Sequence, residues 1–298
     1  MDRVLLRRSL LYVPGSSPKM IARAFDVPAD GIIFDLEDAV APPEKECARA
    51  AVATALDAPR DGRKEILVRV NAVTSPLGLR DLLAVVPKRP DTIVVPKADA
   101  VSILAADVVI GALEQELGLP PGTIGLVPLM ETAASIVDAA AIVAAASRVT
   151  GLQFGAEDLT KELGIARTTV GDELHHARST LVFAGRARGI SIIDTPFVHH
   201  ADPAALVAET ERVKGLGMTG KTCIHPNQVA AVNAVFTPTD DEVAQARRVV
   251  AAFAEATAAG KGACSLDGKM IDPPVAERAR KLLDKADRIA GGRAPATN

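Results

Sequence analysis

The sequence predicts a (β/α)8 TIM barrel followed by a C-terminal helical extension. Eight short, near-continuously apolar runs alternate with segments that have helical features. Strands that are apolar along their whole length are typical of a parallel sheet buried on both faces. The 298 residues are enough for eight βα units and one further segment. An open doubly wound sheet is the alternative, but no G-x-G-x-x-G motif follows the first predicted strand.

The composition supports a large core and excludes several classes of protein. Hydrophobic residues make up 48% of the chain and aromatic residues only 3%, so Ala, Val, Leu and Ile must fill the core. A net charge of −3 gives no reason to expect nucleic acid or an anionic membrane as partner. Cys47, Cys223 and Cys264 form no C-x-x-C pair, which argues against a disulfide framework or a zinc site. Without a signal peptide or a membrane-spanning run, we expect a cytoplasmic protein.

The elements of the predicted barrel follow one another from residue 9 onward. The eight strands are predicted at residues 9–13, 31–34, 65–70, 92–95, 125–130, 150–154, 190–193 and 220–224. Ser17-Pro18 and Asp202-Pro203 each offer an N-cap followed by a first-turn proline, so each begins a helix. Further helices are predicted around residues 44–49, 79–86, 102–117, 133–146 and 173–188.

A C-terminal segment remains after the barrel, which should close near residue 226. Thr239 and Glu242 have capping-box spacing, which predicts a helix to about residue 259. A polar connection and a last amphipathic helix at about 275–289 follow. We therefore predict a barrel domain over 1–236, a helical extension over 237–290 and a disordered tail over 291–298.

Polar residues stand at the C-terminal ends of all eight predicted strands, where a barrel of this kind builds its functional face. They are Tyr12, Glu37 with Asp38, Arg69, Lys97, Glu131, Asp158, Asp194 and His225. Carboxylates from two successive strand ends, Glu131 and Asp158, can bind one hard divalent cation whose shell water or substrate completes. Helix capping or loop solvation is the alternative role for these two residues.

Arg69 adds a second element of the same chemistry, because a guanidinium can bind a carboxylate or a carbonyl oxygen that becomes negative. A metal ion and an arginine around a small oxyacid suit enolate chemistry, since both stabilise charge that develops in the transition state. A structural ion pair of Arg69 with Glu37 or Asp38 is also open. Lys97 is either a structural partner at the barrel mouth or a Schiff-base lysine.

With these residues in place, the chain resembles the citrate lyase β-subunit-like CoA-ester lyases, within the wider malyl-CoA lyase and HpcH/HpaI aldolase group. The resemblance extends from about Arg7 to Ala286. Its motifs are Leu-Tyr-Val-Pro-Gly (11–15), Asp-Leu-Glu-Asp-Ala-Val (35–40), Arg-Val-Asn (69–71), Val-Pro-Lys (95–97), Met-Glu-Thr (130–132), Phe-Gly-Ala-Glu-Asp (154–158), Gly-Lys-Thr-Cys-Ile-His-Pro-Asn-Gln (220–228) and Gly-Lys-Met-Ile-Asp (268–272). Their order along the chain and their places at strand ends make the match specific.

The resemblance implies a role for each matching residue. Glu131 and Asp158 would bind Mg²⁺, and Arg69 would bind the acyl or keto-acid oxygen. Glu37 and Asp38 would orient Arg69 or the waters of the metal. The CoA thioester would be contacted by Tyr12, Lys19, Arg23, Ile193 and Asp194, although the position of Arg23 often holds lysine in relatives. Asp272 would be the acid/base, on a segment that covers the active site of a neighbouring subunit in a trimer or hexamer.

The activity implied is that of a carbon–carbon lyase (an oxo-acid-lyase). A 3-hydroxyacyl-CoA would be cleaved by a retro-Claisen reaction to acetyl-CoA and a 2-oxo acid. Citramalyl-CoA, malyl-CoA and citryl-CoA are all candidate substrates, of which we favour the first two. The alternatives are a citrate lyase β subunit acting on an acyl-carrier-protein thioester, a CoA-independent 2-oxo-acid aldolase, and a non-catalytic binding protein.

Overall fold

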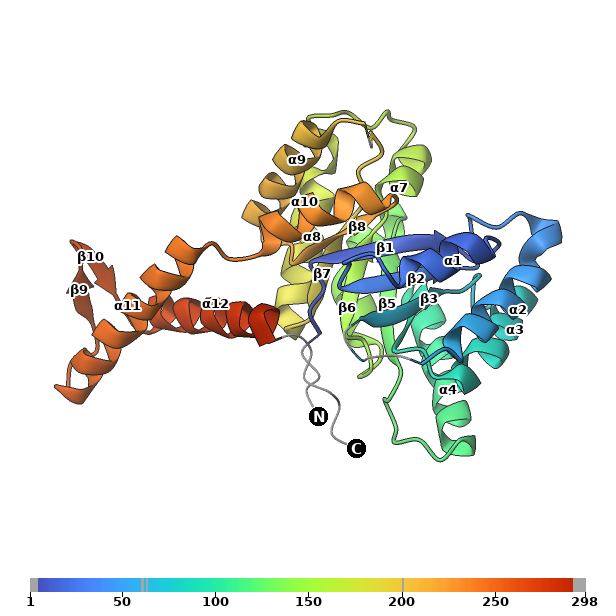
Figure 1. Cartoon of the computed structure of the whole chain (residues 1–298), viewed down its shortest axis with the longest axis horizontal. Helices are drawn as coiled ribbons and strands as arrows, with labels where there is room; N and C mark the ends of the chain where they lie inside the picture. The colour runs from blue at the N-terminus through green and yellow to red at the C-terminus, as the bar shows by residue number, and fades with distance from the viewer. Residues whose placement is uncertain (1–4, 60–61, 63, 200, 292–298) are drawn as a thin grey trace. The chain divides into compact units, whose positions relative to one another are not determined.

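The computed structural model describes residues 5–59, 62, 64–199 and 201–291. The chain divides into two compact units, residues 1–235 and 236–298. The first unit is a closed barrel of eight parallel strands with helices between them, which confirms the predicted fold class (Figure 1). Of the tail predicted over 291–298, residues 292–298 lie outside the described part of the chain.

The strands agree with the predicted runs to within one residue at each end. They are β1 (Ser9–Pro14), β2 (Gly31–Asp35), β3 (Glu65–Arg69), β4 (Thr92–Val95), β5 (Gly125–Met130), β6 (Gly151–Phe154), β7 (Ser191–Asp194) and β8 (Gly220–Cys223). Each strand pairs in parallel with the next, and β1 pairs with β8 to close the barrel. All eight C-terminal strand ends therefore meet at one mouth of the barrel, where the polar residues that follow the strands can gather.

Helices link the strands and cover the outside of the barrel (Figure 1). They are α1 (Pro18–Ala24), α2 (Lys45–Leu56), α3 (Pro76–Val85), α4 (Ala100–Glu116), α5 (Ala133–Val137), α6 (Ala139–Ala144), α7 (Ala156–Leu163), α8 (His175–Arg188), α9 (Pro203–Leu216) and α10 (Pro226–Phe236), with short 3-10 turns at Pro42–Glu44, Val86–Lys88 and Asp172–Leu174. Ser17 and Asp202 cap α1 and α9 as predicted. In the described residues, no helix has the length and apolar character needed to cross a membrane.

The interior of the barrel is an apolar cluster made by alternate residues of the strands. Leu10, Ile33, Leu67, Val94, Val127, Leu129 and Ile193 form it, with Tyr12 packed against it. The residues on either side of Ile33, Ile32 and Phe34, are also fully buried, so β2 is covered on both faces. This two-sided burial explains why the strands are apolar without alternation.

Two stretches of the barrel unit differ from their predicted form. The Ala-rich run over 133–146 is two short helices, because Asp138 adopts a non-helical backbone between α5 and α6. The segment after residue 154 begins at once with α7, so Asp158 lies in its first turn. A direct start of a helix after β6 was not predicted from the sequence.

The second unit consists of α11 (Asp240–Ala258), a two-stranded hairpin of β9 (Cys264–Leu266) and β10 (Lys269–Ile271), and α12 (Pro273–Gly291). The predicted capping box of Thr239 and Glu242 begins α11. The hairpin stands where a polar connection was expected. Asp267 and Gly268 form its turn with positive φ values of 53° and 75°, the conformation that Asp-Gly favours in two-residue hairpin loops.

Candidate active site

A pocket of about 300 Å³ opens at the C-terminal ends of the barrel strands. Five of the predicted site residues line it: Tyr12, Asp38, Arg69, Glu131 and Asp158. Asp35 and Gln153 also line it, and neither was singled out from the sequence. The pocket thus combines acidic, basic and neutral hydrogen-bonding groups above the apolar interior of the barrel.

Arg69, the last residue of β3, is held in the pocket wall by carboxylates. Asp35 binds it with both oxygens, at 2.7 Å from Nε to Oδ1 and 2.6 Å from Nη2 to Oδ2. Glu37 lies 3.1 Å and Asp38 3.7 Å from Nη1, so both predicted partners are present. Burial disfavours the charge on Arg69, but Asp35 and Glu37 offset this effect and raise its pKa well above the usual value. Arg69 therefore stays charged.

The partner that sequence reasoning missed is Asp35. Asp35 and Arg69 are directly opposite each other in the register of β2 and β3. Asp35 also accepts the backbone N–H groups of Glu37 and Ala39, at 2.9 and 3.0 Å. It is 1% exposed and thus ties the loop after β2 to the guanidinium. Its signal in the sequence was its place as the last residue of a strand, next to another strand that ends in arginine.

Glu131 follows β5 and is almost fully buried. Burial raises its pKa to about 7, although the Lys97 N–H and the Arg69 charge favour the ionised form. Oε1 accepts the Lys97 N–H at 2.8 Å. A Cβ on Gly155 would lie 2.6 Å from the Glu131 Cβ and 2.8 Å from Oε2. Only glycine fits at residue 155, so the Phe-Gly-Ala-Glu-Asp motif makes room for this carboxylate.

The donor set suits a hard cation such as Mg²⁺. Glu131 and Asp158 line the same pocket and offer only oxygen ligands. A desolvated carboxylate with a raised pKa gains most from a nearby dication, which restores its ionised form. Across the described part of the chain, no group of three or more His, Cys, Asp and Glu residues has the arrangement of a metal site. These residues therefore permit a dication to be bound by two protein carboxylates, with its other ligands supplied by oxygens of water or substrate.

Lys97 connects the two halves of the site. Its backbone is in the left-handed region, with φ 45°, which directs the N–H to Glu131. Its Nζ donates to Glu37 at 3.0 Å. Burial lowers the pKa of Lys97, but the pair with Glu37 outweighs this and raises it. A protonated, paired amine supports the structural role of Lys97 over the Schiff-base role, which needs a neutral amine.

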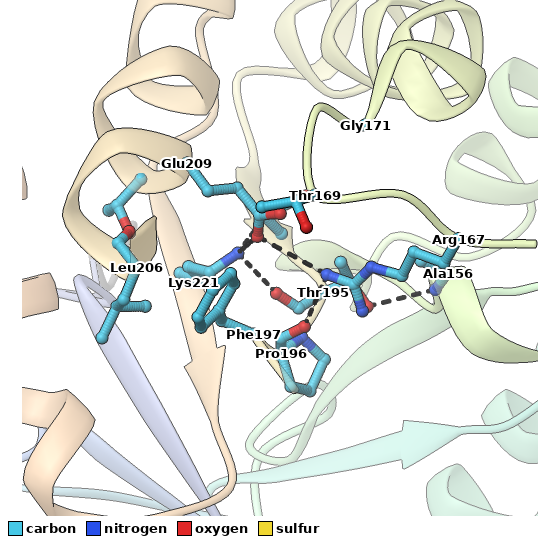
Figure 2. A network of polar contacts seen from close by, with 12 residues as sticks. Ala156, Arg167, Thr169, Gly171, Thr195, Pro196, Phe197, Leu206, Glu209 and Lys221 are labelled. Atoms are coloured by element: carbon cyan, nitrogen blue, oxygen red, sulfur yellow. Dashed lines mark hydrogen bonds and ion pairs between the residues drawn. The ribbon is translucent and has the colours of Figure 1, made fainter. Parts of the chain in front are cut away.

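A buried ionic network, of which Figure 2 shows the part around Lys221 and Glu209, includes residues next to the pocket. Lys221 of β8 donates to Asp194 and to Glu209 of α9, both at 2.6 Å, and to the carbonyl of Thr195 at 2.8 Å. Arg178 pairs with the other side of Asp194 at 2.8 Å. Burial opposes ionisation of Asp194, but Lys221 and Arg178 overcome this and lower its pKa to about 2. The network fixes the segment after β7, whose Thr195 and Pro196 line the pocket.

Arg167 extends this network to the first turn of α7. It donates to the carbonyl of Pro196 at 2.9 Å and lies 3.5 Å from Glu209 (Figure 2). It also donates to Glu157 at 2.7 Å. The N–H of Ala156 donates to Thr195 Oγ1 at 3.1 Å. These contacts hold the start of α7, and with it Asp158, against the loop after β7. The roles of Arg167 and Glu209 were not predicted.

The other predicted substrate residues lie outside the pocket lining. Lys19 and Arg23 lie on the exposed face of α1, whose Met20 lines the pocket. Ile193 belongs to the barrel interior and Asp194 to the ionic network, both fully buried. Asp272 lies in the second unit, where its Oδ1 accepts the Val275 N–H at 3.1 Å and caps α12. Contact of Lys19, Arg23, Ile193 and Asp194 with a thioester stays a prediction, and so does the acid/base role of Asp272.

Comparison with known proteins gives one consistent result. The family model of the HpcH/HpaI aldolase/citrate lyase family matches residues 8–226. The citrate lyase subunit beta of Escherichia coli is 40% identical over 282 residues, which cover 94% of this chain and 93% of the relative. A (3S)-malyl-CoA thioesterase of Cereibacter sphaeroides is 39% identical over 287 residues, covering 96% and 97%.

Solved structures agree with these relatives. Protein CitE from Mycobacterium tuberculosis, in complex with magnesium, acetoacetate and coenzyme A, is 32% identical with a TM-score of 0.77 and covers 95% of this chain and 98% of its own. The citrate lyase beta subunit from M. tuberculosis complexed with oxaloacetate and magnesium is 32% identical with a TM-score of 0.66, covering 80% and 100%. Magnesium is thus bound in solved structures that share this fold.

Proposed function

The chain belongs to the HpcH/HpaI aldolase/citrate lyase family, and from this premise we propose that it is a Mg²⁺-dependent CoA-ester lyase. Its reaction is the cleavage of a 3-hydroxyacyl-CoA to acetyl-CoA and a 2-oxo acid. The observation that carries the proposal is one pocket lined by Glu131, Asp158 and an Arg69 that both carboxylate oxygens of Asp35 hold in place. These are the groups needed to hold a dication beside a fixed positive charge.

The residues of the pocket divide the work between binding and charge stabilisation. Glu131 and Asp158 hold the Mg²⁺ ion, which when bound supplies positive charge to the carboxylate and hydroxyl oxygens of the substrate. Arg69 stabilises the oxygen that becomes negative when the C–C bond breaks. Its fixed position matters, because a donor that is already oriented costs no reorganisation during the reaction. Glu37 and Asp38 share in orienting it.

The CoA part of the substrate lies along α1 in this proposal. Lys19 and Arg23 are one helical turn apart on its exposed face, where they pair with phosphate groups of CoA. Tyr12 lines the pocket and contacts the thioester end. In support, the M. tuberculosis CitE structure that covers nearly the whole chain contains coenzyme A.

Asp272 is the proposed acid/base, supplied by a neighbouring copy in a homo-oligomer. Mixing two inactive variants, Arg69→Ala and Asp272→Ala, tests this arrangement. If the groups act across a subunit boundary, a mixed oligomer contains pockets with both residues intact, and activity returns after subunit exchange. Activity that never returns, although exchange is demonstrated with tagged subunits, would place Asp272 on the same chain as its pocket or outside the mechanism.

The acyl group is tested with a panel of citramalyl-, malyl- and citryl-CoA, measuring acetyl-CoA release with Mg²⁺ and then with EDTA. Metal-dependent cleavage of one ester is the expected result, with Glu131→Ala as the inactive control. A pocket discriminates one methylene by only about 1–3 kcal/mol, so rates on all three esters must be compared. No release from any ester would contradict the proposal.

The second candidate is a citrate lyase β subunit acting on a carrier-bound thioester. The 40% identity to the citrate lyase subunit beta of E. coli favours it. Silence on free CoA esters, together with cleavage of citryl thioester on an acyl carrier protein that co-purifies, would support this function. Hydrolysis of malyl-CoA to malate would instead indicate the thioesterase activity named for the C. sphaeroides relative.

A further inference from the structure

Gln153 is a polar side chain in an apolar place. It is 1% exposed. In the register of the barrel it lies opposite Leu129 of β5 and Ile193 of β7, and both of these belong to the apolar interior. Leucine or methionine would fill the same volume without a polar group to satisfy. The amide therefore needs an explanation other than packing.

The amide of Gln153 is only half satisfied. Nε2 lies 2.6 Å from the Tyr12 hydroxyl, to which it donates. Oε1 is buried and has no hydrogen-bond partner among the described residues. Exchanging the two amide atoms would leave Nε2 unpaired instead, so Tyr12 alone cannot satisfy both. An unpaired buried polar atom costs about 1–3 kcal/mol, so Gln153 lowers the stability of the barrel relative to an apolar residue.

The bond to Gln153 decides where the Tyr12 proton points. A phenol has one proton, and here the amide already occupies a lone pair of its oxygen. The proton is then directed to another acceptor, and Tyr12 and Gln153 both line the pocket. Burial, opposed by the Arg69 charge, raises the pKa of Tyr12, so the hydroxyl keeps its proton. The Arg69 guanidinium lies over the Tyr12 ring, 4.9 Å from its centre, so Tyr12 packs against the group proposed to stabilise negative charge.

We propose that Gln153 is a positioning residue: its amide holds the Tyr12 hydroxyl as a hydrogen-bond donor into the pocket, toward an oxygen of the acyl thioester. This inference rests on the proposed lyase function. The donor adds to Arg69 in the same pocket: it belongs to Tyr12 of β1, and Gln153 of β6 contacts it across the barrel interior. An acyl oxygen bound there meets a neutral donor of fixed direction, which needs no reorientation during the reaction.

A double-mutant cycle of Gln153→Met and Tyr12→Phe tests the inference. Methionine keeps the length of glutamine and removes both polar groups. We expect Gln153→Met to lower kcat/KM for the cleaved ester by about 10- to 100-fold, as losses of supporting hydrogen bonds do. Its unfolding temperature should equal or exceed that of the wild type, because no buried amide remains unpaired. Gln153→Leu is the second variant, for use if methionine packs poorly, and the same lower kcat/KM and undiminished unfolding temperature are expected of it.

The cycle separates positioning from other roles. If Gln153 acts through the Tyr12 hydroxyl, Gln153→Met has no further effect on kcat/KM once Tyr12 is phenylalanine. Gln115→Met, the same change on the exposed face of α4, should leave activity unchanged. Losses that multiply in the double variant, wild-type kcat/KM in Gln153→Met, or a loss explained by a lower unfolding temperature would each overturn the inference. A wild-type protein that cleaves no ester would instead overturn the proposed function.

Discussion

Replacing Asp35 by asparagine tests how Arg69 is held. Asp35 accepts four hydrogen bonds, two from Arg69 and one each from the N–H groups of Glu37 and Ala39. Asparagine keeps the shape of the side chain and one acceptor oxygen, but not the charge. Breaking a buried ion pair by changing one partner costs about 3–5 kcal/mol. Because Glu37 still lies 3.1 Å from the guanidinium, we expect the lower end of this range.

Two measurements follow from this magnitude. A loss of about 3 kcal/mol corresponds to a fall in unfolding temperature of about 6–12 °C for a domain of this size. The activity of the folded enzyme should fall further than stability requires, since Arg69 loses its fixed direction. Loss of one preorganised donor to a developing oxyanion lowers kcat by about 10²–10³, and we expect a decrease of this order in kcat/KM at a temperature where the variant is folded.

Asp30→Asn is the matched control. Asp30 precedes β2, whereas Asp35 is the last residue of that strand. Asp30 is 8% exposed and binds Arg8 with both carboxylate oxygens, at 3.0 and 2.8 Å. Its replacement should lower the unfolding temperature and leave kcat/KM unchanged. If both variants lose activity equally, the loss reflects stability alone. If Asp35→Asn keeps wild-type kcat/KM, the idea that Asp35 orients Arg69 is wrong.

Three further changes address other parts of the site. Burial raises the pKa of Glu131 to about 7 from 4.5, so Mg²⁺ affinity measured by calorimetry should fall about tenfold per pH unit below 7. The metal-free protein should lose stability as the pH rises from about 4.5 to 7, because the folded state binds this proton more tightly than the unfolded chain. Glu131→Gln should remove both effects. Lys97→Val should unfold about 1–2 kcal/mol more easily than Lys97→Gly in urea, because residue 97 has φ 45°; equal stabilities would contradict this strain. Asp272→Asn keeps the cap of α12, so this variant should unfold like the wild type but cleave the ester at least about 100-fold more slowly. Asp272→Ala should be equally slow and should also lose about 1 kcal/mol of stability. An unchanged kcat in both variants would remove Asp272 from the mechanism.

The eight strands were predictable because two local signals coincide in each of them. Burial on both faces makes each run apolar, and a turn or capping residue ends it, as Ser17-Pro18 does soon after β1. Where the local signals conflict, the prediction fails. Asp138 interrupts an alanine-rich helix, and the Asp-Gly turn at residue 267 closes a hairpin whose strands have only three residues each.

The site was predictable only as far as strand ends identify it. Glu131, Asp158 and Arg69 stand where apolar runs stop, so their meeting at the barrel mouth follows from the fold. The roles of Asp35 and Gln153 follow from strand register, which the sequence alone does not give. Asp35 binds Arg69 because the two residues are directly opposite on β2 and β3. Gln153 reaches the pocket because it is paired with the inward-facing Leu129 of β5. A glutamine inside an apolar strand was the one local sign of the second role.

The balance of charge around the pocket predicts the order in which Mg²⁺ and the ester bind. Six carboxylates line the pocket or stand beside it, namely Asp35, Glu37, Asp38, Glu131, Glu157 and Asp158, and the cations that pair with members of this set are Arg69, Lys97 and Arg167. Such a mouth attracts a dication and repels an anionic acyl-CoA. Arg69 cannot reverse this alone, because Asp35 and Glu37 already neutralise it. We therefore expect Mg²⁺ to bind first, and EDTA should weaken binding of the ester as well as abolish its cleavage.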